Sequence, residues 1–297
     1  MPTLTFIQSR ALTITTAAIV LTLGISACSS NASSSGPSPT VSLSTGPGTG
    51  LPSAHVHGLS VNSETGQVLL ATHDGLFDVS KNQSVKIGPT NDLMGFTAAM
   101  DEGVFYASGH PGPGSELPNP LGLIRSTDGG KSWEKLSRQG ESDFHALATT
   151  KSGIVAYDGT LQTSTDGKSW KTATAGFAPA ALAGNPYSDT VLATTPQGLQ
   201  RSTDAGNTWA VDPAAPIIQF AAFAGTTEAV GVTPDGTVYI SADAGATWKK
   251  TGKIDGEVQA IAASEGAEGS PWIWAATTTG LTVSTDGGTT FRPADAD

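Results

Sequence analysis

One short motif recurs five times in this sequence at nearly even spacing, and this repeat constrains the fold more than any other feature. Each copy begins with serine, has aspartate two residues later and ends on Trp or Phe. The five aspartates are Asp128, Asp166, Asp204, Asp243 and Asp286. Successive aspartates are 38, 38, 39 and 43 residues apart. A period of this length is typical of folds built from repeated supersecondary units.

The five copies resemble the Asp box, also called the BNR repeat, with the pattern S-x-D-x-G-x-x-W. They are Ser126–Trp133, Ser164–Trp170 (one residue shorter), Ser202–Trp209, Ser241–Trp248 and Ser284–Phe291. In a β-hairpin the aspartate accepts backbone N–H groups across the turn. Glycine supplies the positive φ that the turn needs, and the aromatic ring packs beneath it. We therefore expect these aspartates to hold turns rather than to catalyse a reaction.

The segments between the boxes also repeat, as short apolar runs that read as strands. A further unit without a box precedes the first one, with residues 79–82 at the box position. The six units begin near residues 54, 91, 142, 177, 216 and 257. Four strands per unit predict an all-β, six-bladed β-propeller with Asp-box hairpins, because closing the ring leaves no long exposed sheet edge.

The first 28 residues contain a basic residue followed by an apolar run, and this pattern predicts an export signal. Arg10 precedes an apolar run over 11–27. This run ends in Leu23-Gly24-Ile25-Ser26-Ala27, directly before Cys28. This resembles a bacterial lipoprotein signal peptide, in which the cysteine becomes lipidated. An uncleaved membrane anchor is the alternative, but the run is shorter than the ~20 apolar residues of a spanning helix. We expect a signal peptide over 1–27, a lipid anchor and disordered linker over 28–53, and the propeller over 54–297.

This layout places the protein at the cell membrane, lipid-anchored through Cys28 on its extracellular or periplasmic face. Residues 29–52 are mostly Ser, Gly, Pro and Thr, a composition that forms flexible tethers. The formal net charge of −11 argues against nucleic acid as a partner, because phosphate backbones are repelled. Cys28 is the single cysteine, which excludes an intrachain disulfide.

The histidines are confined to the first three units. They are His55, His57, His73, His110 and His145. In Asp-box families the first strand of each blade lines the central channel, and its entry shares one face with the loop between the second and third strands. This resemblance implies that all five histidines lie on one face, opposite the Asp boxes. The positions matching His57 are Met94, His145, Pro179, Phe220 and Gln259.

Imidazole and thioether groups together suit a soft or borderline metal ion. We interpret His55, His57, His73, Met94, His110 and His145 as a candidate site for copper, with zinc as the other possibility. Asp74, Asp92 and Asp143 lie nearby and are candidates to orient the histidines. A ligand-binding polar patch without metal and purely structural histidines remain alternatives. The Pro- and Gly-rich insertion over 110–120 is either a lid on this face or neutral length variation.

The Asp box also raises the possibility of a sialidase-like glycoside hydrolase. Sialidases clamp the substrate carboxylate with three arginines, but here the arginines beyond Arg10 adjoin Asp boxes, away from the channel entry. They are Arg125, Arg138, Arg201 and Arg292. Enzymatic activity therefore stays uncertain, with hydrolysis of surface glycans as the alternative function. The favoured function is a non-catalytic module that binds a protein, peptide or glycan ligand or assists assembly, as similar propellers in photosystem assembly factors and sortilin-type receptors do.

Overall fold

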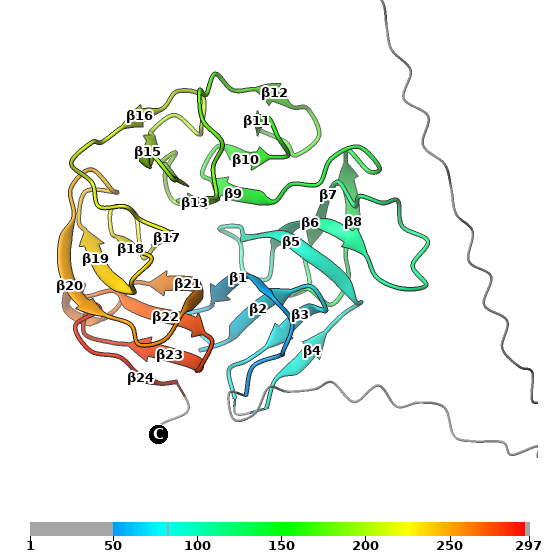
Figure 1. Ribbon diagram of the computed structural model, residues 1–297. Helices are drawn as coiled ribbons and strands as arrows, with labels where there is room; N and C mark the ends of the chain where they lie inside the picture. The colour runs from blue at the N-terminus through cyan, green and yellow to red at the C-terminus, as the bar shows by residue number, and fades with distance from the viewer. Residues whose placement is uncertain (1–49, 82, 295–297) are drawn as a thin grey trace, which may run out of the picture. The chain divides into compact units, whose positions relative to one another are not determined.

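Six four-stranded antiparallel sheets radiate from a common axis, as Figure 1 shows. The computed structural model describes residues 50–81 and 83–294. In every sheet the strands follow in chain order from the innermost to the outermost. The predicted six-bladed β-propeller is therefore confirmed. The predicted signal peptide, Cys28 and most of the predicted linker lie outside the described residues.

Each blade consists of four consecutive strands, and the first strand lies nearest the axis. Blade 1 is β1 (Val56–Val61), β2 (Val68–Thr72), β3 (Gly75–Asp78) and β4 (Val85–Ile87); blade 2 is β5 (Asn91–Ala98), β6 (Phe105–Pro111), β7 (Leu123–Ser126) and β8 (Glu134–Ser137); blade 3 is β9 (Ala146–Thr150), β10 (Gly153–Tyr157), β11 (Leu161–Ser164) and β12 (Lys171–Thr172). Blade 4 is β13 (Ala181–Gly184), β14 (Val191–Thr195), β15 (Gly198–Ser202) and β16 (Ala210–Val211); blade 5 is β17 (Phe220–Phe223), β18 (Ala229–Val232), β19 (Thr237–Ser241) and β20 (Lys249–Lys253); blade 6 is β21 (Val258–Ser264), β22 (Trp272–Thr277), β23 (Gly280–Ser284) and β24 (Arg292–Pro293).

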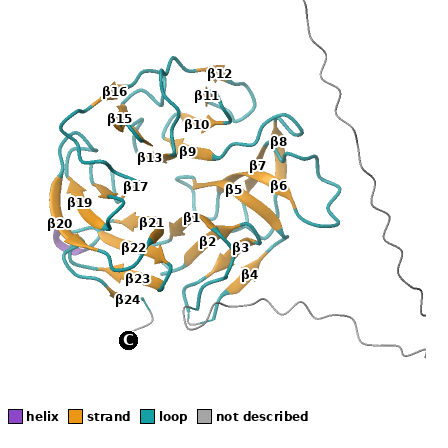
Figure 2. Cartoon of the chain, viewed as in Figure 1, coloured by secondary structure: helices purple, strands orange, loops and turns teal. Residues whose placement is uncertain are grey.

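The hydrophobic core lies between neighbouring blades. Each blade is covered on both faces, so the strands in its middle need apolar residues on both sides. All five residues of β2 and of β14 are buried. Between the strands the described chain is loop and turn, apart from the single helical turn η1 (Ala267–Gly269), as Figure 2 shows. Within the described residues, no helix has the length and hydropathy that crossing a membrane requires.

The Asp boxes form closed hydrogen-bond networks at the turns between third and fourth strands. In blade 2, Asp128 Oδ1 accepts the Ser132 N–H (2.9 Å) and Oδ2 accepts the Ser132 hydroxyl (2.6 Å). The Ser126 hydroxyl donates to Asp128 Oδ1 (2.8 Å) and accepts the Gly130 N–H (2.8 Å). The hydrogen bonds from Ser132 and Ser126 lower the pKa of Asp128 to about 2. These contacts agree with the predicted role of the box in holding the turn.

Each box also packs against the preceding blade through one glycine. A methyl group at Gly130 would collide with Leu76 of blade 1, and one at Gly245 would collide with Leu192 of blade 4. Leu76 and Leu192 are fully buried. The box is therefore both a turn and part of the joint between two blades.

Blade 1 lacks an Asp box, and the joint between blades 6 and 1 is built differently. Val79 lies at the box position and is buried in a cluster with Phe77 and with Trp274 and Val283 of blade 6. Leu51, which the sequence places in the linker, is buried in the same cluster. The ordered contacts of the propeller therefore begin a few residues before the predicted boundary at residue 54.

Candidate functional site

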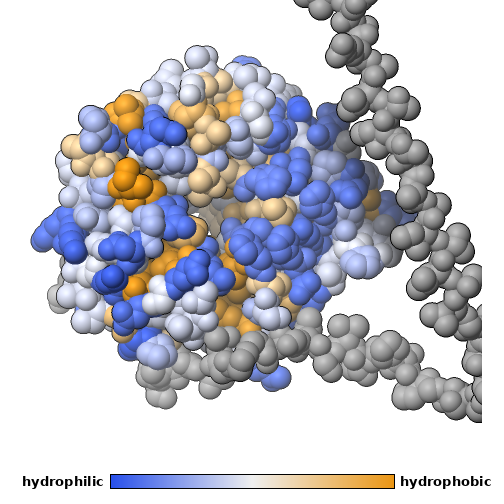
Figure 3. Space-filling model, in the orientation of Figure 1, coloured by the Kyte–Doolittle hydropathy of each residue, from blue (hydrophilic) through white to orange (hydrophobic). Residues whose placement is uncertain are grey.

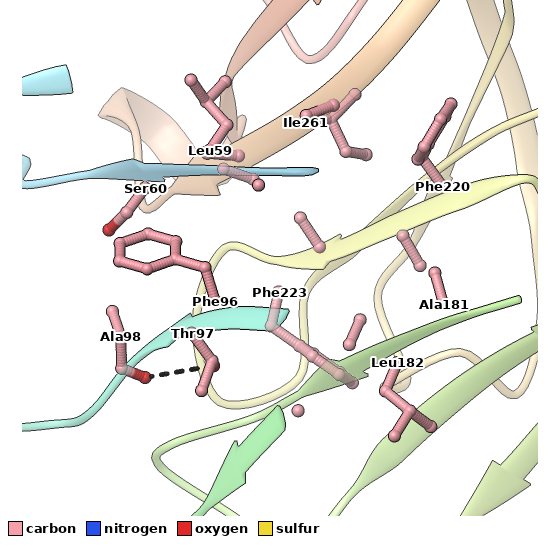
Figure 4. Close-up of a pocket in the computed structure, with 18 of the residues that line it drawn as sticks. Leu59, Ser60, Phe96, Thr97, Ala98, Ala181, Leu182, Phe220, Phe223 and Ile261 are labelled. Atoms are coloured by element: carbon pink, nitrogen blue, oxygen red, sulfur yellow. Dashed lines mark hydrogen bonds between the residues drawn. The ribbon is translucent and has the colours of Figure 1, made fainter. Parts of the chain in front are cut away.

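The first strands of the blades enclose a central channel. Its cavity of about 660 Å³ is lined by residues of β1, β5, β13, β17 and β21, among others. Figure 4 shows Leu59, Phe96, Leu182, Phe220 and Ile261 around this space. Each first strand pairs on one side only, so its other edge offers unpaired backbone groups to the channel. The channel wall thus combines apolar side chains with polar backbone.

The mouth of the channel is shaped by β-bulges in the innermost strands. The pairing register shifts between Val56 and Gly58 in β1, and between Asp92 and Gly95 in β5. A bulge bends its strand and re-aims the side chain of the extra residue. The bulged residues include His57 and Met94, and both line the cavity. On the face shown in Figure 3, hydrophilic residues gather beside the central hollow over blades 1 and 2.

Three histidines of blade 1 converge at this mouth. One imidazole nitrogen each of His55, His57 and His73 lies within 4.8 Å of the other two. His57 Nε2 is 3.3 Å from His73 Nδ1, and the two rings meet edge to face. Asp92 of blade 2 joins this group, with its Oδ1 2.8 Å from His73 Nδ1 and 3.8 Å from His57 Nε2. We call these three histidines, with Asp92, the first histidine group.

His57 is the most enclosed member of the first histidine group, with 10% of its side chain exposed. Burial, helped by the positive charges that His73 and His55 carry when protonated, lowers the pKa of His57 to about 4. The Asp92 carboxylate opposes this effect only in part. At neutral pH His57 is therefore an uncharged imidazole with a lone pair available.

Two further histidines meet at a second carboxylate. His110 Nε2 lies 3.2 Å from Asp143 Oδ2, and His145 Nε2 lies 3.5 Å from the same oxygen. His110 Nδ1 is 2.7 Å from Asn119 Oδ1, and His145 Nδ1 is 3.1 Å from the backbone oxygen of Asp143. We call His110, His145, Asp143 and Asn119 the second histidine group.

The structure therefore divides the six residues predicted as ligands into two groups. His55, His57 and His73 share one, His110 and His145 share the other, and Met94 lies at the cavity wall. His110 lies at the end of β6 rather than in the following loop, opposite Asp92 in the strand pairing. Of the three carboxylates predicted to orient histidines, Asp92 and Asp143 do contact them. Asp74 instead acts electrostatically on Lys86.

The register also revises two of the positions matched to His145. The His145 N–H donates to the Tyr157 carbonyl beside the first strand pair of blade 3. The equivalent bonds in blades 4 and 5 come from Ala180 and Gln219, not from Pro179 and Phe220. The sequence match was one residue off in these blades because the strands have no landmark residue at that point.

Asn119 is a site residue that no sequence motif singles out. It belongs to the Pro- and Gly-rich insertion of blade 2, and its side chain contacts His110. Through this contact the insertion holds a histidine of the mouth in a fixed orientation. The sequence hints at this contact only in that the insertion begins with His110 and has the polar Asn119 near its end.

Arg125 and Arg201 lie away from the mouth, as the sequence predicts, but Arg138 does not: its Nε donates to Ser142 Oγ, beside Asp143, and its Nη2 lies 3.9 Å from Asp158 Oδ2. Arg125 on β7 pairs with Glu134, and Arg201 on β15 donates to the Ala244 backbone oxygen. None of the described residues lining the cavity is an arginine. The channel mouth therefore has no arginine clamp for a substrate carboxylate.

Comparison with known proteins supports the fold. Residues 124–135 match the model of the BNR/Asp-box repeat. No curated protein matches the sequence. A GH74 enzyme from Niastella koreensis superposes with a TM-score of 0.55 at 16% identity, covering 81% of this chain and 37% of that chain.

A second solved structure is similar to the same extent. It is the extracellular domain of a protein described as a hybrid two component system from B. thetaiotaomicron, with a TM-score of 0.53, 13% identity and coverage of 81% of this chain and 33% of that chain. The chain thus spans about a third of the length of either neighbour. At these identities the likeness concerns the propeller fold alone.

Proposed function

We propose that this Asp-box propeller is a non-catalytic binding module that holds a transition-metal ion at its channel mouth. The ligands are His55, His57 and His73, and the ion is copper or zinc. A lipid on Cys28 holds the propeller at the outer side of the cell membrane. A protein, peptide or glycan that approaches the mouth is the partner that this arrangement suits.

The convergence of three imidazoles is the observation that carries the proposal. One nitrogen of each ring lies within 4.8 Å of the other two, and the closest pair is 3.3 Å apart. Ligand atoms at bonds of about 2.0–2.1 Å around a tetrahedral ion are about 3.3 Å apart, so this pair already has the spacing of two ligands. Small rotations of exposed His55 would complete the set.

The electrostatics of the first histidine group also favour a cation. Metal binding needs an unprotonated imidazole, and the pKa of about 4 leaves His57 unprotonated at neutral pH. Asp92 lies against His73 and His57 and contributes negative charge. Because Asp92 Oδ1 faces the same His73 Nδ1 that lies beside His57 Nε2, this nitrogen must give up its proton to bind the ion, and the neighbouring carboxylate charge then favours the cation.

Three protein ligands leave a coordination position open for a fourth group. Sites of this kind bind water or an external ligand there. Met94 lies at the same mouth, and a thioether favours copper over zinc. An open position facing solvent is where a side chain or carboxylate of a partner would bind.

Metal titration of the purified, tag-free protein tests this function. We expect stoichiometric binding of Cu²⁺ or Zn²⁺, and the loss of about one equivalent in the His57→Ala/His73→Ala variant, because two of three ligands are gone. Gln259→Ala is the matched control. Gln259 occupies the bulge of β21 at the same mouth and should leave binding unchanged.

Two results would speak against the proposal. Binding of less than about 0.1 equivalent of either ion by the unaltered protein would remove the metal site. Release of reducing sugar from surface glycans that persists after chelation would support the hydrolase interpretation instead. The anchor is tested separately, since Cys28→Ala should move the protein out of the membrane fraction.

A further inference from the structure

The second histidine group poses a charge problem that its own residues do not solve. The Nε2 atoms of His110 and His145 both face Asp143 Oδ2, at 3.2 and 3.5 Å. The three side chains come from the end of β6 and the segment before β9, next to the insertion of blade 2. Both histidines therefore contact the same carboxylate oxygen on one side of the mouth.

The other nitrogen of each ring is already committed as a donor. His110 Nδ1 faces Asn119 Oδ1 at 2.7 Å, and His145 Nδ1 faces the Asp143 backbone oxygen at 3.1 Å. Both partners are oxygens that only accept hydrogen bonds, so each Nδ1 carries the ring proton. In neutral imidazole the Nε2 atom then has a lone pair and no proton.

Two imidazole lone pairs and a carboxylate oxygen therefore point toward one place. Such an arrangement is repulsive unless a proton on one Nε2 or a metal ion lies between the groups. Anchoring Nδ1–H on an oxygen while Nε2 is left free is also the usual way in which metal-binding histidines are oriented.

Asp143 itself lacks the donors that would satisfy a carboxylate. Its Oδ1 is buried and has no hydrogen-bond partner among the described residues. In the described part of the chain, its ion pairs are those with His110 and His145, and its side chain is only 20% exposed. A buried carboxylate oxygen left unpaired is costly, so Asp143 has fewer donors than a carboxylate needs and Oδ2 is left with the two imidazoles alone among the described residues.

We propose that His110, His145 and Asp143 bind a second divalent transition-metal ion, separate from the ion held by the first histidine group. Two imidazoles and one carboxylate form a ligand set that Zn²⁺ and Cu²⁺ accept, with a position left open. Asn119 is a positioning residue that holds His110. The site rests on its own contacts and does not require the first site to be filled.

Counting bound Zn²⁺ in matched variants by calorimetry tests this inference. We expect about two equivalents in the unaltered protein, about one in His110→Ala/His145→Ala, about one in His57→Ala/His73→Ala and none when all four are replaced. Asp143→Asn keeps the side-chain volume, so it tests the site even if the double variant folds poorly. It should weaken the second site by about 10- to 100-fold.

Asp74→Asn is the control, since Asp74 is an exposed aspartate near the mouth outside both groups. The inference is overturned if His110→Ala/His145→Ala binds as much Zn²⁺ as the unaltered protein. It is also overturned if NMR of the imidazoles shows both rings doubly protonated at pH 7 with Zn²⁺ in excess. Failure of the first site alone gives a different result, namely one equivalent that disappears with His110 and His145.

Discussion

Aspartates lie on both faces of this propeller, but their surroundings are opposite. At the Asp-box face, Asp204 accepts the Thr208 N–H and the hydroxyls of Thr208 and Ser202, at 2.7–2.8 Å. At the channel mouth, Asp92 and Asp143 face imidazole nitrogens, and one oxygen of Asp143 has no hydrogen-bond partner among the described residues. The same side chain is saturated with donors on one face and short of them on the other.

On the proposed function, this difference separates a carboxylate that stabilises the fold from one that helps to bind an ion. A carboxylate surrounded by N–H and O–H donors is stabilised as an anion and stays within the fold. A carboxylate surrounded by histidines has partners whose charge depends on protons or on metal ions. The first kind therefore contributes to stability, and the second kind responds to what the solution supplies.

The largest effect should come from the glycine of a box that contacts the neighbouring blade. Gly130→Ala should lower the free energy of unfolding by about 2–4 kcal/mol, because its methyl group meets buried Leu76 and its φ is +85°. Gly129→Ala is the control. Gly129 has φ +76° with open space around it, and Ala205 and Ala244 adopt similar backbone angles at the matching positions. Urea unfolding measures the free energy of unfolding of both variants. Equal losses would mean that contact with the neighbouring blade does not restrict the residue at position 130.

Replacing one aspartate of each kind by alanine tests the comparison directly. Asp204→Ala should cost about 2 kcal/mol of unfolding free energy, since three hydrogen bonds at the turn are lost. Asp92→Ala should cost about 0.5 kcal/mol or less in metal-free protein, since it loses one partly exposed hydrogen bond. The order reverses in the Zn²⁺ titration, where only Asp92→Ala should weaken binding. A larger stability loss from Asp92 than from Asp204 would contradict this assignment of roles.

The smallest expected effect is a difference in pH dependence. The pKa of His57 is about 4 in the fold and 6.5 as the ordinary value, so the unfolded chain binds the extra proton first as pH falls. Metal-free protein should therefore lose on the order of 1 kcal/mol as pH drops from 6.5 to 4, after allowance for screening by solvent. His57→Gln should lack this contribution.

The boxes should respond in a lower pH window. Hydrogen bonds from Thr247 and Ser241 lower the pKa of Asp243 to about 2, below its ordinary 3.8. Their contribution is present above pH 3.8 and is lost as pH falls toward 2. Urea unfolding at pH 7, 5.5, 4 and 3 separates the windows. Parallel curves for the unaltered protein and His57→Gln would show that His57 is not enclosed as described.

Much of the fold could be predicted from the sequence because the repeat is local. Each Asp box fixes its own turn, and even spacing gives the number of blades. The gathering of His55, His57 and His73 on one face also followed once the blades were superposed. The division into two groups did not follow, because it depends on which carboxylate, Asp92 or Asp143, each imidazole reaches, and the repeat pattern does not determine side-chain contacts. Asn119 was missed since its contact crosses an insertion without periodic pattern.

The way the ring closes has a consequence for engineering. No described sheet mixes strands from the two ends of the propeller, so every blade is a self-contained stretch of chain. New termini placed at any other blade junction would leave all six sheets intact, whereas joining the original ends would have to preserve Leu51 and Val79 beside Trp274. Circular permutation is thus open to this protein, with the junction between blades 6 and 1 as the part that a permuted chain has to rebuild.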